Sequence, residues 1–203
     1  DYYASRGLGD VYKRQVQASD VNPVCEVKYI PLELTDNSLI GSIDKILYRN
    51  KHFYIFDKSA NMGILIFNEN GKFIKVLNRT GEGPGEYIAP IDFDVDAEGN
   101  IYIADNARQK IIKYDANDFR QYEEIDLKCY FMEFAIIDKE YIVLSEIYDQ
   151  GKIRDKLAIY SKKDKKIQSL LKPALTEMDE LRIPRHSSHY LLSLIHISEP
   201  TRR

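Results

Sequence analysis

The chain has 203 residues, with 29 Lys plus Arg against 32 Asp plus Glu, and a formal net charge of −3 at pH 7. This mildly acidic balance supplies no electrostatic attraction for nucleic acid, and no apolar run approaches the roughly 18 residues that a membrane-spanning helix needs. The composition therefore excludes a nucleic-acid partner and a transmembrane segment within these residues.

Residues 1–15 and 192–203 look like translated sequencing-adapter DNA. Residues 192–202 spell LSLIHISEPTR, which resembles the translation of the adapter that transposase-based kits attach to DNA fragments. Residues 10–15 spell DVYKRQ, which the reverse complement of the adapter's first segment would encode. A natural gene has no reason to carry both strands of one oligonucleotide at its ends, so we assign 1–15 and 192–203 to the adapter. The native part is then 16–191, cut from a longer gene.

Residues 16–42 are predicted to form an N-terminal strand and its lead-in to a series of repeats. The strand covers 27–32, and two interpretations stay open for it. It is either the outer strand of a preceding repeat or the strand that closes a ring of repeats. The two cysteines, Cys25 and Cys129, are expected to be unpaired thiols without metal-ligand spacing, and Cys25 is not a lipid-anchor site.

Internal repetition is the main signal between the two ends. The string FYIFD at 53–57 recurs as IYIAD at 101–105, 48 positions later. The string ILIFN at 64–68 recurs as IIKYD at 111–115 and as LAIYS at 157–161, after 47 and then 46 positions. A period in the forties, built from short β-branched and aromatic runs, is typical of the four-stranded blades of a β-propeller. Partial alternation within these runs also predicts sheets that are covered on both faces.

Turn residues divide each repeat into four predicted strands. Segments such as DAEGN at 96–100 supply residues that tolerate the positive φ of tight hairpins. The three repeats occupy 43–90, 91–130 and 131–172, and 173–191 is either an insertion or the start of a next blade. The strands are expected at 43–48, 53–57, 64–67 and 73–77, at 91–95, 101–104, 111–114 and 122–125, and at 131–137, 141–145, 157–160 and 167–171.

One resemblance is carried by residues 102–115, YIADNARQKIIKYD, which are similar to the NHL repeat family. Blades of that family carry an aromatic-aliphatic-Asp strand, a polar turn with Asn and Arg, and an aliphatic-aromatic-Asp strand. The first repeat departs from this pattern at Gly63, where an arginine would be expected. The third departs further, because Ser145 replaces the aspartate and a longer loop, 146–156, replaces the turn.

A second resemblance covers roughly 27–172. The strings YIPLE at 29–33, SLIGSIDKI at 38–46 and GEGPGEY at 81–87 are similar to the six-bladed β-propeller family of bacterial envelope proteins. This resemblance implies an all-β fragment of about three four-stranded antiparallel blades out of six. It also implies an exported protein, in the periplasm or as an outer-membrane lipoprotein whose lipid anchor precedes these residues. Most members have no assigned activity, so the resemblance implies fold and compartment without chemistry.

The glycine-rich segment TGEGPGEY at 80–87 is the sharpest local feature, and it joins the first repeat to the second. The favoured interpretation is a structural crossover, in which three glycines allow unusual backbone conformations and a proline stiffens the path. Its structural residues are Gly81, Gly83, Pro84 and Gly85. The alternative is a binding surface near the mouth of the propeller channel. Its candidate residues are Arg79, Glu82, Glu86, Tyr87, Asn106 and Arg108.

Two groups of aspartates complete the candidate residues. Asp57 and Asp105 end equivalent strands, and we interpret both as structural turn residues that accept hydrogen bonds from backbone N–H groups. Asp92, Asp94 and Asp96 place three carboxylates on one side of a strand, but a hard cation needs oxygens that converge from several loops. No catalytic residue, metal ligand or cofactor is therefore predicted.

These features favour a non-enzymatic ligand-binding or protein-interaction module, whose partner is a protein, a peptide or a carbohydrate. The alternative is an enzyme of the lyase or lactonase type on the same scaffold, with its site in the central channel. A fold that binders and enzymes share does not decide between them. A cluster of Asp, Glu, Asn or His from several blades on the propeller axis would favour the enzyme.

Overall fold

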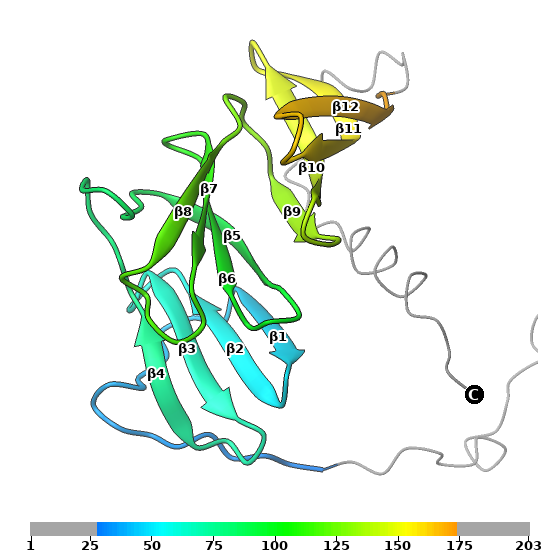
Figure 1. Ribbon diagram of the computed structural model, residues 1–203. Helices are drawn as coiled ribbons and strands as arrows, with labels where there is room; N and C mark the ends of the chain where they lie inside the picture. Colours follow the sequence, from blue (N-terminus) through cyan, green and yellow to red (C-terminus); the bar gives the residue numbers. More distant parts are fainter. Residues whose placement is uncertain (1–27, 174–203) are drawn as a thin grey trace, which may run out of the picture. The chain divides into compact units, whose positions relative to one another are not determined.

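Twelve strands form three four-stranded antiparallel sheets in residues 28–173, the part of the chain that the computed structural model describes (Figure 1). In each sheet, strands that are neighbours in the sequence are neighbours in space. The predicted fold class, all-β with three four-stranded antiparallel blades, is confirmed.

Blade 1 contains β1 (Lys45–Arg49), β2 (His52–Asp57), β3 (Gly63–Asn68) and β4 (Phe73–Leu77). Blade 2 contains β5 (Pro90–Val95), β6 (Ile101–Asp105), β7 (Lys110–Tyr114) and β8 (Tyr122–Asp126). Blade 3 contains β9 (Glu133–Ile136), β10 (Tyr141–Asp149), β11 (Lys152–Ser161) and β12 (Lys166–Leu171).

The chain divides into two compact units, and all twelve strands of the described residues belong to the second, 32–203. The described part of the first unit, 1–31, is limited to 28–31. Over the described part of the chain, no helix has the length and hydropathy that crossing a membrane requires. The predictions that lie outside the described residues are those for 1–15, 16–27, 174–191 and 192–203.

The strand predicted at 27–32 is absent over its described positions. Residues 28–32 form no strand, and Tyr29 is 89% exposed. Pro31 has no backbone N–H to donate to a ladder, which disfavours a paired strand here. The apolar character of this segment was therefore a misleading signal.

Alternate side chains of one strand pack against different neighbouring blades. In β6, Ile101 and Ile103 belong to the apolar cluster that blade 2 shares with blade 1. Tyr102 and Ala104 belong to the cluster that blade 2 shares with blade 3. Since successive side chains point to opposite faces of a strand, a continuous apolar run fills both cores. Within the described residues, this packing covers both faces of the blade 2 sheet.

Blade 3 departs from the prediction in its two central strands. Segment 146–156, predicted as a loop, instead continues β10 and β11 into a hairpin in which Asp149 lies opposite Lys152. The turn residues Gln150 and Gly151 have φ of 48° and 78°. Positive φ at both positions is the mark of a two-residue hairpin turn, but such turns usually carry Asn, Asp or Gly at the first position. The glutamine made the turn hard to recognise.

Candidate functional site

The glycine-rich crossover between β4 and β5 folds back on itself. The Gly81 N–H donates to the Tyr87 carbonyl at 3.0 Å, and the Tyr87 N–H donates to the Arg79 carbonyl at 3.0 Å. Gly85 has φ of 66°, and a Cβ on it would lie 2.5 Å from the Tyr122 ring. Only glycine fits this position, since it combines a left-handed backbone with close approach of a ring.

Glu86 and Tyr87 hold the crossover from inside. The Glu86 carboxylate accepts the Gly83 N–H at 2.9 Å. Tyr87 is fully buried, and its hydroxyl donates to the Met62 carbonyl at 2.9 Å and accepts the Arg79 N–H at 3.2 Å. Burial raises the pKa of the Tyr87 hydroxyl to about 12. This side chain therefore stays protonated and does not reach a ligand in solvent.

Arg108 fastens the crossover from blade 2. Its guanidinium donates to the carbonyl oxygens of Glu82 at 2.6 Å, Glu86 at 3.2 Å and Gly83 at 3.4 Å. The structure thus brings Arg108 to Glu82 and Glu86, as the binding alternative required, but it does so through the loop backbone. The Arg108 guanidinium therefore uses its N–H groups to hold the loop backbone.

A shallow depression of about 520 Å³ lies over this crossover. The Lys110 ammonium pairs with the Glu124 carboxylate at 2.7 Å, and the same carboxylate accepts the Gly85 N–H at 3.0 Å. Three of the charged groups of the depression, those of Arg108, Lys110 and Glu124, therefore bond to one another or to the loop. Its lining residues are Glu82, Gly83, Pro84, Arg108, Lys110, Tyr122 and Glu124.

Arg79 and Asn106, two further candidate binding residues, do not line this depression. Arg79 Nε and Asn106 Oδ1 are both buried, and neither has a hydrogen-bond partner within residues 28–173. The Asn106 N–H donates to the Ala89 carbonyl at 3.2 Å, which ties the turn after β6 to the chain that enters blade 2. Arg79 Nε and Asn106 Oδ1 are therefore not accessible to a ligand in solvent.

Asp57 and Asp105 connect the end of a strand to the chain that enters the same blade. The Asp57 carboxylate accepts the Gly41 N–H at 2.8 Å and the Ala60 N–H at 3.0 Å, and Asp105 accepts the Ile88 N–H at 3.0 Å. Burial would raise the pKa of Asp57, but these hydrogen bonds outweigh it and lower that pKa. Both aspartates thus hold backbone from two segments, which is the geometry of a structural turn residue.

Blade 3 makes the corresponding connection without a carboxylate. Ser145 takes the equivalent position, and its buried hydroxyl has no hydrogen-bond partner among the described residues. The extended β10 instead brings the Tyr148 N–H to the Tyr130 carbonyl of the incoming chain, at 2.8 Å. In blade 3, the longer β10 therefore makes the hydrogen bond to the incoming chain that an aspartate makes in blades 1 and 2.

The aspartates of β5 connect all three blades. Asp92 accepts the Lys45 ammonium of β1 at 2.8 Å and the Phe134 N–H of β9 at 3.0 Å. Asp94 accepts the Ile136 N–H of β9 at 2.7 Å. Both carboxylates are buried, and burial raises the pKa of Asp94. These oxygens are engaged in holding adjacent inner strands together.

Asp96 does not join this arrangement. Its carboxylate accepts the Asn100 N–H at 2.8 Å and the Tyr102 hydroxyl at 3.2 Å, both within blade 2. Across the described residues, no group of three or more His, Cys, Asp or Glu side chains is placed to hold a metal ion.

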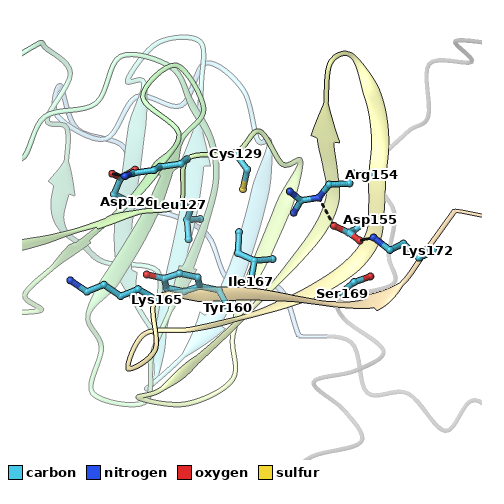
Figure 2. Close-up of a pocket in the computed structure, with 11 residues that line it drawn as sticks. Asp126, Leu127, Cys129, Arg154, Asp155, Tyr160, Lys165, Ile167, Ser169 and Lys172 are labelled. Carbon is cyan, nitrogen blue, oxygen red and sulfur yellow. Dashed lines mark hydrogen bonds and ion pairs between the residues drawn. The ribbon is translucent and has the colours of Figure 1, made fainter.

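A more enclosed pocket of about 600 Å³, here called the inter-blade pocket, lies between blades 2 and 3 (Figure 2). One wall is the chain that leaves β8, with Leu127 and Cys129, and the other is formed by β11 and β12. Cys129 is a buried free thiol, and burial raises its pKa. The lining residues are Asp126, Leu127, Lys128, Cys129, Arg154, Asp155, Tyr160, Lys165, Ile167, Ser169 and Lys172.

Asp155 is the electrostatic centre of the inter-blade pocket. Its side chain is 2% exposed, and it accepts Arg154 Nε at 2.7 Å and the Lys172 ammonium at 2.6 Å. Burial alone would raise its pKa, but hydrogen bonds from Lys172, Ser169 and Arg154 lower the pKa of Asp155 to about 2. The carboxylate is therefore ionised at neutral pH and orients two cations.

The sequence does not indicate the inter-blade pocket, because it predicts a loop at 146–156. A hairpin turn at 150–151 would have placed Asp155 opposite Ile147, which is fully buried. A buried aspartate next to an arginine is an informative signal, since buried carboxylates are normally paired. The pairing of β10 with β11 beyond Ser145 and Leu157 is what places Asp155 in the interior.

We predict that Asp155→Asn flattens the acid dependence of stability. The unfolded aspartate, with a pKa near 3.9, binds a proton before the native one does, so the wild-type free energy of unfolding falls as the pH drops from about 5 to 2. The variant lacks this contribution and is less stable at pH 7, and the two proteins converge near pH 2. Urea unfolding at several pH values measures the effect, with Asp126→Asn as the exposed control. An unchanged pH slope in Asp155→Asn would contradict the pairing.

Comparison with known proteins provides a family and a related fold. A family model described as Domain of unknown function (DUF4934) matches residues 10–200. The structure of a candidate exported protein from Bacteroides fragilis NCTC 9343 is 25% identical, with a TM-score of 0.63, over 74% of this chain and 43% of that one. A member of the DUF4221 family from Bacteroides vulgatus ATCC 8482 is 14% identical, with a TM-score of 0.49, over 70% of this chain and 46% of that one.

The chain spans less than half the length of both of these proteins. No curated protein matches the sequence.

Proposed function

The chain belongs to the DUF4934 family, which is described as a domain of unknown function, and we propose that it is a non-enzymatic binding module of the bacterial cell envelope. It contributes about three blades to a six-bladed β-propeller and binds a small ligand, a peptide or a carbohydrate. The observation that carries this proposal is the inter-blade pocket, which combines about 600 Å³ of space with charged side chains from three segments.

The chemistry of the inter-blade pocket favours binding over a purely structural role. At the glycine-rich crossover, Arg108 and Glu124 bond to loop backbone, so little hydrogen-bonding capacity remains for a ligand. In the inter-blade pocket, Lys128 and Lys165 line the space in addition to the two cations that Asp155 holds. Concave sites of 300–1,000 Å³ with a few convergent polar groups are where small ligands usually bind.

The ring size and the compartment are supported by the Bacteroides fragilis structure. This chain contributes three blades and spans 43% of that protein, as expected for about half of a six-bladed ring. That protein is described as a candidate exported protein, and we extend this compartment to the present chain as a periplasmic protein or an outer-membrane lipoprotein. Recovery of the protein in the cytosolic fraction, after expression from the complete gene in a Bacteroides host, would contradict the compartment.

The binding function is tested by filling the inter-blade pocket in the protein encoded by the complete gene. Ser169→Trp places a large ring in the pocket, whereas Gln168→Trp puts the same ring on the opposite face of β12. A panel of sugars, sugar acids and short peptides is screened by thermal shift. We expect stabilisation by at least one compound in the wild type and in Gln168→Trp, and its loss in Ser169→Trp. Equal stabilisation of both variants, or no stabilisation by any compound, would contradict the proposal.

A further inference from the structure

We propose that the inter-blade pocket selects ligands that carry a carboxylate, which the free end of the Arg154 guanidinium binds with help from Lys128. This inference rests on the proposed binding function and adds the chemical class of the ligand. It follows from the charge, the geometry and the walls of the pocket.

The charge of the inter-blade pocket is opposite to that of the chain. Its lining includes four cations, Lys128, Arg154, Lys165 and Lys172, against the two carboxylates of Asp126 and Asp155, which leaves an excess of two positive charges. The whole chain has a net charge of −3. A local positive excess inside a concave site attracts anions, because low-dielectric walls focus the field.

Among the described residues, 28–173, the Arg154 side chain donates a hydrogen bond only through Nε, to Asp155. The two terminal nitrogens of its guanidinium have no hydrogen-bond partner within this range. Figure 2 shows the guanidinium directed from Asp155 toward the side of the pocket where Cys129 lies. A guanidinium held through Nε is pre-oriented, and its terminal N–H groups match the two oxygens of a carboxylate.

The apolar part of the pocket lining favours an organic anion over inorganic phosphate. Leu127, Tyr160 and Ile167 provide an apolar wall for a carbon skeleton, which phosphate lacks. Lys128 has a side chain that is 83% exposed, and its pair with Asp126 is long, at 3.9 Å. Because such exposed pairs are weak, Lys128 can leave Asp126 to meet the ligand.

The test is isothermal titration calorimetry at pH 7 and low salt, on the protein encoded by the complete gene. The carboxylate probes are galacturonate, N-acetylneuraminate and succinate, and the controls are galactose and inorganic phosphate. We expect at least one carboxylate to bind more tightly than both controls. Arg154→Ala should weaken that binding at least tenfold, and Lys128→Ala should weaken it several-fold. Since Lys128 is exposed, the second variant is expected to fold even if the first does not.

Arg120→Ala is the matched control, since Arg120 pairs with Asp118 on the surface of blade 2, outside the pocket lining. Its binding should equal that of the wild type. Galactose binding that Ser169→Trp abolishes, without a preference for any carboxylate, would overturn the ligand class and leave the binding function standing. Tighter binding of phosphate through Arg154 would also overturn the ligand class. If neither these probes nor the wider thermal-shift panel bind at the pocket, both proposals are wrong.

Discussion

Phe93→Ala is expected to lower the free energy of unfolding by about 3–5 kcal/mol, the usual cost of removing a buried phenyl ring. Phe93 lies on β5 and is fully buried in the cluster that blades 1 and 2 share. Its ring meets the Phe56 ring edge-on, with 5.6 Å between the centroids. The substitution removes this contact between blades and leaves a cavity that the β-sheets on both sides cannot close.

The measurement is chemical unfolding with guanidinium chloride, followed by circular dichroism. Ile88→Ala is the control, because Ile88 is 41% exposed on the crossover and its truncation should cost less than about 1 kcal/mol. A loss of less than about 1 kcal/mol in Phe93→Ala would show that blades 1 and 2 do not share a packed core.

Asp92→Ala is expected to lower the free energy of unfolding by about 3 kcal/mol, because it removes one carboxylate that holds three blades. Without it, the buried Phe134 N–H has no acceptor and the Lys45 ammonium loses its anionic partner. Asp92→Asn should lie between the wild type and Asp92→Ala, since an amide oxygen can still accept the Phe134 N–H but carries no charge.

Asp118→Ala is the control for this series, because Asp118 forms its ion pair with Arg120 two residues away on an exposed turn. Asp118 also accepts the Arg120 N–H at 3.0 Å, and exposed interactions of this kind contribute little to stability, so a loss of less than about 1 kcal/mol is expected. If Asp92→Ala behaves like the control in the same unfolding experiment, the connection between β1, β5 and β9 does not stabilise the protein.

Much of each blade could be predicted from the sequence because it depends on neighbouring residues. The turn DAEGN at 96–100 closes a hairpin through local hydrogen bonds, such as the Gly99 N–H to the Asp96 carbonyl at 3.1 Å. The apolar runs IYIAD and IIKYD then pair in register, with Ile103 opposite Ile112. The hairpin at 150–151 escaped prediction because its turn residues give a weak local signal.

The sequence by itself therefore determined most of the strands, the repeat and the all-β class, since these depend on patterns within a few tens of residues. Only the tertiary structure decided how the charged residues are used. Arg108 turned out to bind loop backbone, Asp92 connects three blades, and Arg154 with Asp155 lines a pocket. The physical reason is that these contacts join segments separated by as many as 47 positions, and stacking of the blades, which no local pattern specifies, sets the distance between them.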